Sequence, residues 1–179
     1  SEVFLTYGIP FTFTNEIGIE QTLVGGAVQA LLDLTDEETL TSGLQDLAAN
    51  RLVTLDAFSI DPDALSAAAE KAPEQTLERL LETLEKDDQT ATADGIRELV
   101  ATVDSSDDGF AGFTSELADV LEALAVEDAV EEYASSDEAT GSHRPAYEQS
   151  AWSAVERVLS SFNAVSSYLA EQQPARRVR

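Results

Sequence analysis

Cysteine and methionine are absent from this sequence, and histidine and tryptophan each occur once. The absence of cysteine excludes disulfides, thiol nucleophiles and thiolate metal sites. A single histidine excludes metal cages built from several histidines. Because most residue sets used in covalent and metal-assisted catalysis are missing, we expect a protein without enzymatic activity, cofactor or resident metal ion.

Long apolar stretches are also absent. The best candidate, residues 23–34, contains Gln29 and Asp33, whereas a membrane-spanning helix needs about 20 apolar residues. The first residues, Ser1-Glu2-Val3-Phe4, lack the basic and apolar regions of a secretory signal. We therefore predict a cytoplasmic protein without a membrane span, or a virion protein if the source is viral.

Basic residues are few beside the acidic ones. The 179 residues include 35 acidic and 10 basic ones, for a net charge of −25, yet 43% are hydrophobic. That apolar content is too high for a disordered acidic chain, and the length suits one domain. The composition resembles that of proteins from salt-accumulating halophiles, in which molar salt shortens the Debye length to about 3 Å. The alternative is an acidic patch that recruits a basic partner, and either interpretation disfavours general nucleic-acid binding.

The first 14 residues alternate apolar and polar side chains around Gly8 and Pro10. This pattern predicts a short β or extended arm, because proline and glycine weaken a strand inside a sheet. Its aromatic residues Phe4, Phe11 and Phe13 need a covering surface. That surface lies either within the same chain or on a neighbouring subunit.

Helical spacing dominates residues 15–134, which we predict to form a helical bundle. Gly25-Gly26 suggests close packing or a bend in the first helix. Thr35 and Glu38 match a capping box, which predicts a helix from about Asp36 to Asn50.

The middle of the chain contains further helix signals. Residues 51–59 predict a short strand or a packed connector. Asp61-Pro62 predicts a helix through Lys71, and Pro73 predicts the start of the next helix. Apolar spacing then favours a helix from Phe113 to Tyr133.

A polar linker is predicted over residues 135–146, followed by a long helix over 147–172 and a basic tail over 173–179. The long helix carries an apolar seam that suits either a bundle core or an oligomer interface. We predict that contacts between subunits use the arm and this seam: Phe4, Phe11, Phe13, Trp152, Val155, Leu159, Phe162 and Leu169.

One acidic loop resembles half of a calcium-binding loop. Asp104, Ser106 and Asp108 precede Gly109 at the expected spacing, but the closing carboxylate, Glu116, falls one residue late. The loop is therefore a weak calcium candidate, and a solvated connection between helices is the favoured interpretation.

The tail reverses the local charge, since it carries Arg176, Arg177 and Arg179. It is either a solubilising end or a segment that docks on an acidic partner surface or on nucleic acid. The linker holds His143, which has no nucleophile motif beside it.

These features favour a non-catalytic structural or interaction subunit of a halophile-type assembly, either a homo-oligomer or one part of a larger complex. By fold-level analogy alone, virion connector and tail-adaptor subunits combine helical bundles with arms in this way. Two alternatives remain: a small carboxylate-based enzyme or ligand-binding protein, and a regulatory adaptor that docks through its arginine-rich tail.

Overall fold

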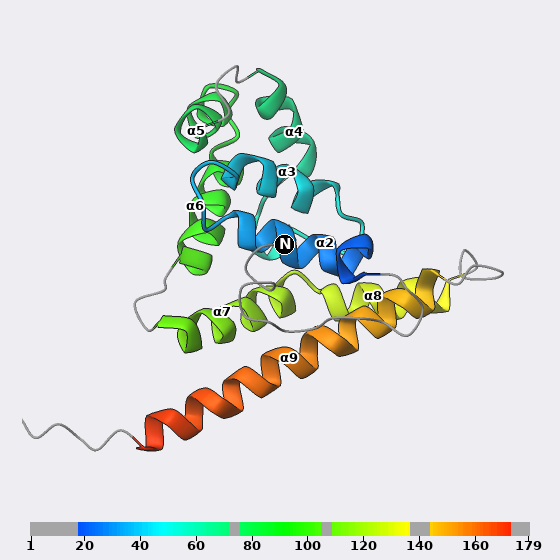
Figure 1. Ribbon diagram of the computed structural model, residues 1–179. Helices are drawn as coiled ribbons and strands as arrows, with labels where there is room; N and C mark the ends of the chain where they lie inside the picture. The colour runs from blue at the N-terminus through cyan, green and yellow to red at the C-terminus, as the bar shows by residue number, and fades with distance from the viewer. Residues whose placement is uncertain (1–17, 72–75, 105–108, 137–143, 173–179) are drawn as a thin grey trace, which may run out of the picture.

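Helices make up the regular structure of the residues that this computed structural model describes, namely 18–71, 76–104, 109–136 and 144–172 (Figure 1). The mainly α fold predicted from the sequence is confirmed, and these residues contain no strand. The predicted extended arm, residues 1–14, lies outside them. The elements are η1 (Ile19–Gln21), α2 (Leu23–Asp33), α3 (Leu40–Ala49), η2 (Asp56–Phe58), α4 (Pro62–Lys71), α5 (Leu77–Lys86), α6 (Thr90–Asp104), α7 (Gly109–Ala123), α8 (Val126–Ser135) and α9 (Arg144–Gln172).

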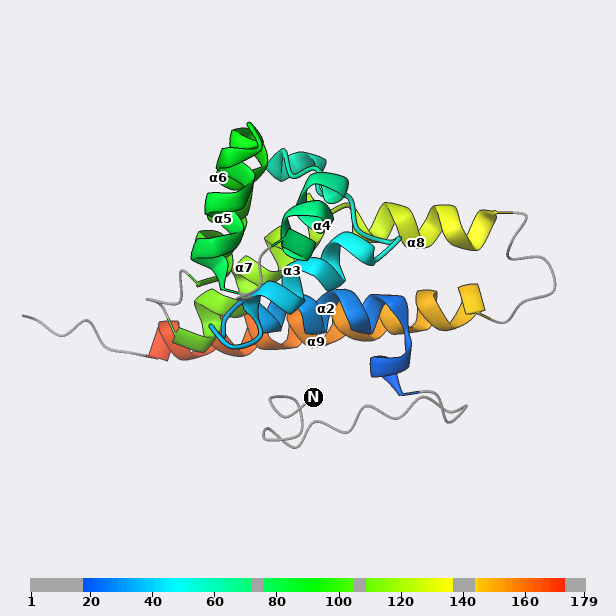
Figure 2. The ribbon, with the colours of Figure 1, turned by 90° about the horizontal axis from the view of Figure 1, so that it is seen from above.

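The helices form two groups around one continuous apolar core (Figures 1 and 2). In the first group, α9 runs along α2, α7 and α8 and contacts all three. The second group contains α4, α5 and α6. It is joined to the first through the contact of α3 with both α2 and α4 and through the contact of α6 with α7.

Leucine stripes at helical spacing supply much of the core. In α5, Leu80 and Leu84 are fully buried, and each buried leucine stabilises the fold by about 1.5–3 kcal/mol. On the same helix Glu82 pairs with Lys86 at 3.8 Å, as its i,i+4 spacing predicts.

The predicted limits of α4 are confirmed. The helix begins at Pro62 and ends at Lys71. Asp61 caps it, because its Oδ1 accepts the backbone N–H groups of Asp63 at 2.9 Å and Ala64 at 3.3 Å. A first-turn proline needs no such acceptor, since it has no N–H group.

The capping box predicted at Thr35 is wrong. The hydroxyl of Thr35 donates to the carbonyl of Leu32 at 2.7 Å, so this residue closes the end of α2. The chain then turns, and α3 begins at Leu40 instead of near Asp36. The predicted end of this helix is confirmed, since Asn50 follows its last residue.

Two further local predictions need correction or refinement. The helix predicted to open at Pro73 begins instead at Leu77, because Thr76 is extended and its hydroxyl accepts the N–H of Arg79 at 3.4 Å. Of the two structures predicted for residues 51–59, the packed connector is observed. It contains η2 and buries Leu52 and Phe58.

The helix predicted from Phe113 to Tyr133 is divided into α7 and α8. Ala125 adopts the left-handed conformation, with φ 53°, and interrupts the helical backbone. The carbonyl of Leu124 instead accepts the N–H of Thr54 at 2.9 Å. A tertiary hydrogen bond thus accompanies the break. The long last helix also differs from its prediction, since it begins at Arg144 instead of 147.

Candidate functional site

A buried carboxylate joins the start of α9 to the start of α2. Glu148 is 4% exposed. Its Oε1 accepts the N–H of Leu23 at 2.9 Å, and its Oε2 accepts the N–H of Val24 at 3.0 Å. First-turn amides have no partner within their own helix, and the helix dipole favours a negative charge there. Glu148 therefore satisfies two amides and fixes α9 against α2.

The rest of the first turn of α2 is closed locally. The hydroxyl of Thr22 accepts the N–H of Gly25 at 2.9 Å and donates to the carbonyl of Ile19 at 2.6 Å. A Cβ atom on Gly25 would lie 1.8 Å from that carbonyl oxygen, whereas one on Gly26 would lie 3.6 Å from Asn50 Nδ2. The close packing predicted for the two glycines therefore applies to Gly25.

Sequence reasoning missed Glu148, although a signal was present. The residue stands four positions before Trp152 and seven before Val155, so it occupies the register of the apolar seam. A charged residue in a buried register indicates a specific partner, because an unpaired buried charge is costly. The partner could not be named from the sequence, since the two amides lie 125 and 124 positions away.

The first half of the seam on α9 packs within the chain. Val155 is 7% exposed and Ala151 is fully buried. Trp152 and Leu159 are partly buried and pack against the same core. In this half the seam serves the bundle core, one of the two uses predicted for it.

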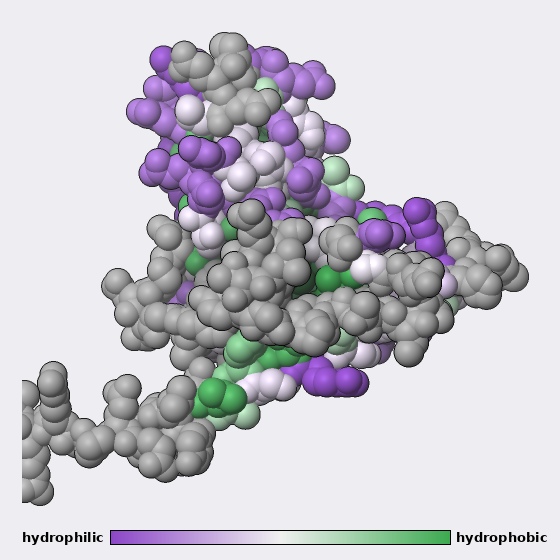
Figure 3. Space-filling view, in the orientation of Figure 1, coloured by the Kyte–Doolittle hydropathy of each residue, from purple (hydrophilic) through white to green (hydrophobic). Residues whose placement is uncertain are grey.

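Beyond Leu159 the structure describes the burial of only part of the seam. Phe162 is half-buried, and Val165 is 55% exposed. Hydrophobic surface is visible along α9 toward its C-terminal end in Figure 3. For Leu169 the structure describes only the helical backbone. The predicted contacts between subunits stay a prediction, and Val165 is the large hydrophobic side chain of α9 that the described residues leave exposed.

A groove lies between α7, α8 and α9, with a cavity volume of about 390 Å³. We call it the α7–α9 groove. Its buried and half-buried lining is apolar, and its exposed lining is mostly acidic. The apolar floor consists of Ala118, Leu121, Ala125, Trp152 and Leu159, and the rim consists of Glu122, Glu127, Asp128, Glu156 and Ser160.

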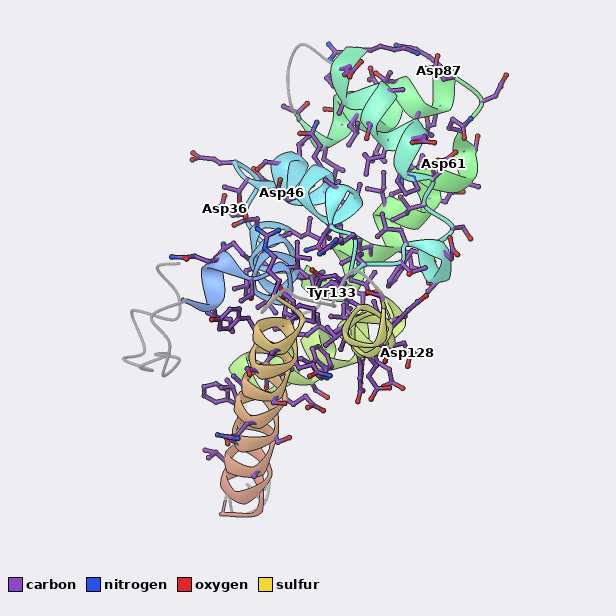
Figure 4. All side chains as sticks on the ribbon, turned by 90° about the vertical axis from the view of Figure 1, so that its right-hand side faces the viewer. Asp36, Asp46, Asp61, Asp87, Asp128 and Tyr133 are labelled. Carbon is purple, nitrogen blue, oxygen red and sulfur yellow. The ribbon has the colours of Figure 1, made fainter. Side chains whose placement is uncertain are left out.

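Two further properties of the groove matter for binding. The indole Nε1 of Trp152 is buried and has no hydrogen-bond partner among the described residues. The lining residues, which all belong to the described part of the chain, include no lysine or arginine. Figure 4 shows Asp128 on the outer side of α8, whereas Tyr133 points toward the interior.

Several acidic side chains on and beside α5 and α6 have basic partners close by. The hydrogen bond from Arg97 to Glu85 is the main cause that raises the pKa of the Arg97 guanidinium above its ordinary value. The ion pairs of this region include Lys71–Asp87, Arg79–Glu82, Lys86–Glu82, Arg97–Glu85 and Arg97–Asp94. The groove differs, because no basic residue is among those that line it.

Other predicted sites fall largely outside the described residues. Asp104 ends α6, and Ser106 and Asp108 lie beyond the described residues, so calcium binding there stays a prediction. His143, the arm residues and the basic tail are outside as well. Over the residues that are described, no group of three or more histidine, aspartate or glutamate side chains is placed to hold a metal ion. No helix within that same part is long and apolar enough to cross a membrane.

No protein-family model, curated protein or solved structure matches this chain. Its function is therefore argued from its own geometry. Exposed Val165 on α9 and the α7–α9 groove are the two surface features available for a contact.

Proposed function

We propose that this chain is a non-catalytic structural subunit that assembles with copies of itself through the second half of α9. The observation that carries the proposal is Val165, a large aliphatic side chain that is 55% exposed on a helix whose first half is core. Val165 and Phe162 are three residues apart and so lie on one helix face. A second copy of α9 offers the same face in return, as a two-fold interface requires.

Charge supports this choice of contact. Two copies of a chain with a net charge of −25 repel each other except where salt screens them. Residues 158–170 contain no charged side chain. The same is true of residues 3–15, which include the predicted arm aromatics Phe4, Phe11 and Phe13. Uncharged segments are the places where a second copy can approach with the least electrostatic cost.

The length of α9 also supports an external contact. Its 29 residues correspond to about 44 Å of helix, against about 23 Å for the 15 residues of α7. Residues 158–170 are rich in serine and alanine. Small side chains allow two helices to pack closely, and the seam spacing suits knobs-into-holes packing.

The setting that we propose is an assembly that works in molar salt, where the acidic surface is screened. A virion connector or tail adaptor is one such assembly, and its support here is fold-level analogy alone. Among the functions predicted from the sequence, self-assembly is the one that uses an exposed apolar side chain such as Val165 on α9. A pocket enzyme would need no such side chain.

Light scattering coupled to size-exclusion chromatography in molar KCl tests the proposal. We expect the full chain to elute as an oligomer and Val165→Asp to elute as a monomer, because a buried unpaired charge is costly. Ser153→Asp is the matched control, since it adds the same charge at an exposed position in the anchored half of α9. A monomeric wild-type chain at every concentration, or equal dissociation by both substitutions, would overturn the proposal.

A further inference from the structure

We propose that the α7–α9 groove binds the basic segment, residues 176–179, of a second copy of this chain. The inference rests on the self-assembly proposed above and names a further contact between neighbouring copies. The groove supplies four rim carboxylates and an apolar floor. The segment supplies three arginines and Val178.

Charge complementarity is the first argument. Three of the 10 basic residues of the chain fall within the four positions of the segment. The groove gathers four carboxylates without a basic residue in its lining. Guanidinium groups pair with carboxylates through two parallel hydrogen bonds, a geometry that lysine does not reproduce. The rim consists of Glu122, Glu127, Asp128 and Glu156, with Ser160 beside them.

The apolar floor is the second argument, because a purely acidic patch would not need one. In an extended segment neighbouring side chains point to opposite sides. Val178 therefore faces the floor when Arg177 and Arg179 reach toward the rim. Trp152 in this floor also carries a buried Nε1 without a hydrogen-bond partner among the described residues, a donor for which a backbone carbonyl of the segment is a suitable acceptor once the indole ring turns. Each chemical feature of the groove thus has a counterpart in the segment.

Chain length decides between the segment of the same copy and that of a second copy. Glu156 precedes the end of α9 at Gln172 by 16 residues of helix, or about 24 Å. Val178 follows Gln172 by six residues, which span at most about 22 Å when fully extended. The lining on α9 runs from Trp152 to Ser160, which precede Gln172 by 20 and 12 residues, or about 30 and 18 Å of helix. The segment of the same copy therefore reaches the Ser160 end of the groove but cannot place Val178 beside Trp152. A neighbouring copy has no such restriction.

A fluorescence titration tests the inference. Trp152 is the single tryptophan of the chain, so its emission reports on the groove. The protein is the full chain with Arg176→Gln, Arg177→Gln and Arg179→Gln. In this variant the protein's own residues 176–179 no longer compete with the added peptide for the groove. The probe is a synthetic peptide of residues 173–179. The titration is run in molar KCl, which suppresses unspecific attraction between an acidic protein and a basic peptide.

Matched variants make the titration specific. The groove variant carries Glu127→Gln, Asp128→Asn and Glu156→Gln. The control carries Glu37→Gln, Glu38→Gln and Glu70→Gln, exposed carboxylates outside the groove lining, so both variants lose the same charge. Val178→Asp and an all-lysine form of the peptide test the same contact from the other side. These peptides need no change in the folded protein.

We expect a saturable change in Trp152 emission. Loss of the three rim carboxylates should weaken binding about tenfold or more, which corresponds to about 1.4 kcal/mol or more. The control variant should bind within about twofold of the parent. The Val178→Asp and all-lysine peptides should both bind more weakly. No saturable change, or equal weakening in groove and control variants, would overturn the inference.

The oligomeric state separates this inference from the proposed function. In one outcome the wild-type chain is an oligomer, the arginine-to-glutamine variant is the same oligomer, and the peptide does not bind. This result overturns the groove contact and leaves assembly through α9 intact. A wild-type chain that is monomeric throughout overturns the proposed assembly and, with it, the second copy as the occupant. An oligomer that weakens when either the rim or the segment is neutralised supports both proposals.

Discussion

Glu148 Oε2 lies 3.0 Å from the backbone nitrogen of Val24, a residue 124 positions earlier in the chain. The contact places a side chain of the last helix on the first turn of α2. Glu148 thereby holds the buried half of α9 in the bundle, and the remaining half extends beyond this anchor.

Replacement of Glu148 should destabilise the fold. Glu148→Gln keeps one acceptor oxygen but removes the charge and one acceptor, and we expect the free energy of unfolding to fall by about 1–3 kcal/mol. Glu148→Ala leaves two amides without a partner and should cost more. Denaturant unfolding in molar KCl measures both variants. Glu131→Gln, at an exposed position of α8, is the control and should stay within about 0.5 kcal/mol. Equal stability of Glu148→Gln and the control would refute the anchoring role.

The two adjacent glycines of α2 should respond in opposite directions to alanine. Gly25→Ala places a Cβ 1.8 Å from the carbonyl oxygen of Ile19, so the backbone at Ile19 must move. We expect the free energy of unfolding to fall by about 1–3 kcal/mol. Gly26→Ala meets only an ordinary contact at 3.6 Å. This variant should therefore raise the free energy of unfolding by up to about 1 kcal/mol, because alanine favours the helix more than glycine does. The measurement is the shift in thermal transition temperature of each variant relative to the wild type. Similar shifts in the two variants would contradict the close packing of Gly25 against Ile19.

The break between α7 and α8 offers a second matched pair. Ala125 has φ 53°, a left-handed conformation that costs about 1–2 kcal/mol for a residue with a Cβ. Ala125→Gly should therefore increase stability, although the greater freedom of glycine in the unfolded chain offsets part of the gain. Ala129→Gly, inside α8, should cost about 1 kcal/mol. If both glycine variants are equally destabilised in urea unfolding, the break does not store conformational strain.

Salt dependence tests the interpretation of the acidic surface. With a net charge of −25, we expect the helical circular dichroism and the sharp thermal transition to be lost on dialysis from about 3 M KCl to about 50 mM. Sorbitol at matched osmolality serves as the control for non-ionic effects. Full retention of both signals in dilute buffer would show that screening is not required.

Local sequence signals predicted several elements at the correct places. Asp61 followed by Pro62 predicted the start of α4, because a carboxylate cap and a proline in the first turn act over a few residues. The end of α3 before Asn50 was also predicted from signals a few residues apart. The seam of α9 was predicted as well, but which of its side chains are buried depends on the helices that lie beside it.

Other features required the tertiary structure. The hydroxyl of Thr35 has several backbone groups within reach, and the packed chain directs it to the end of α2 instead of the start of α3. The break at Ala125 accompanies a hydrogen bond from Thr54, which no local pattern reveals.

The sequence by itself determined the helical class, the acidity and the absence of thiol chemistry, since these follow from composition and short-range spacing. Only the tertiary structure decided that Glu148 caps α2 and that the rim carboxylates gather around Trp152. Both depend on distances between residues far apart in the chain, and those distances are set by packing of the whole bundle.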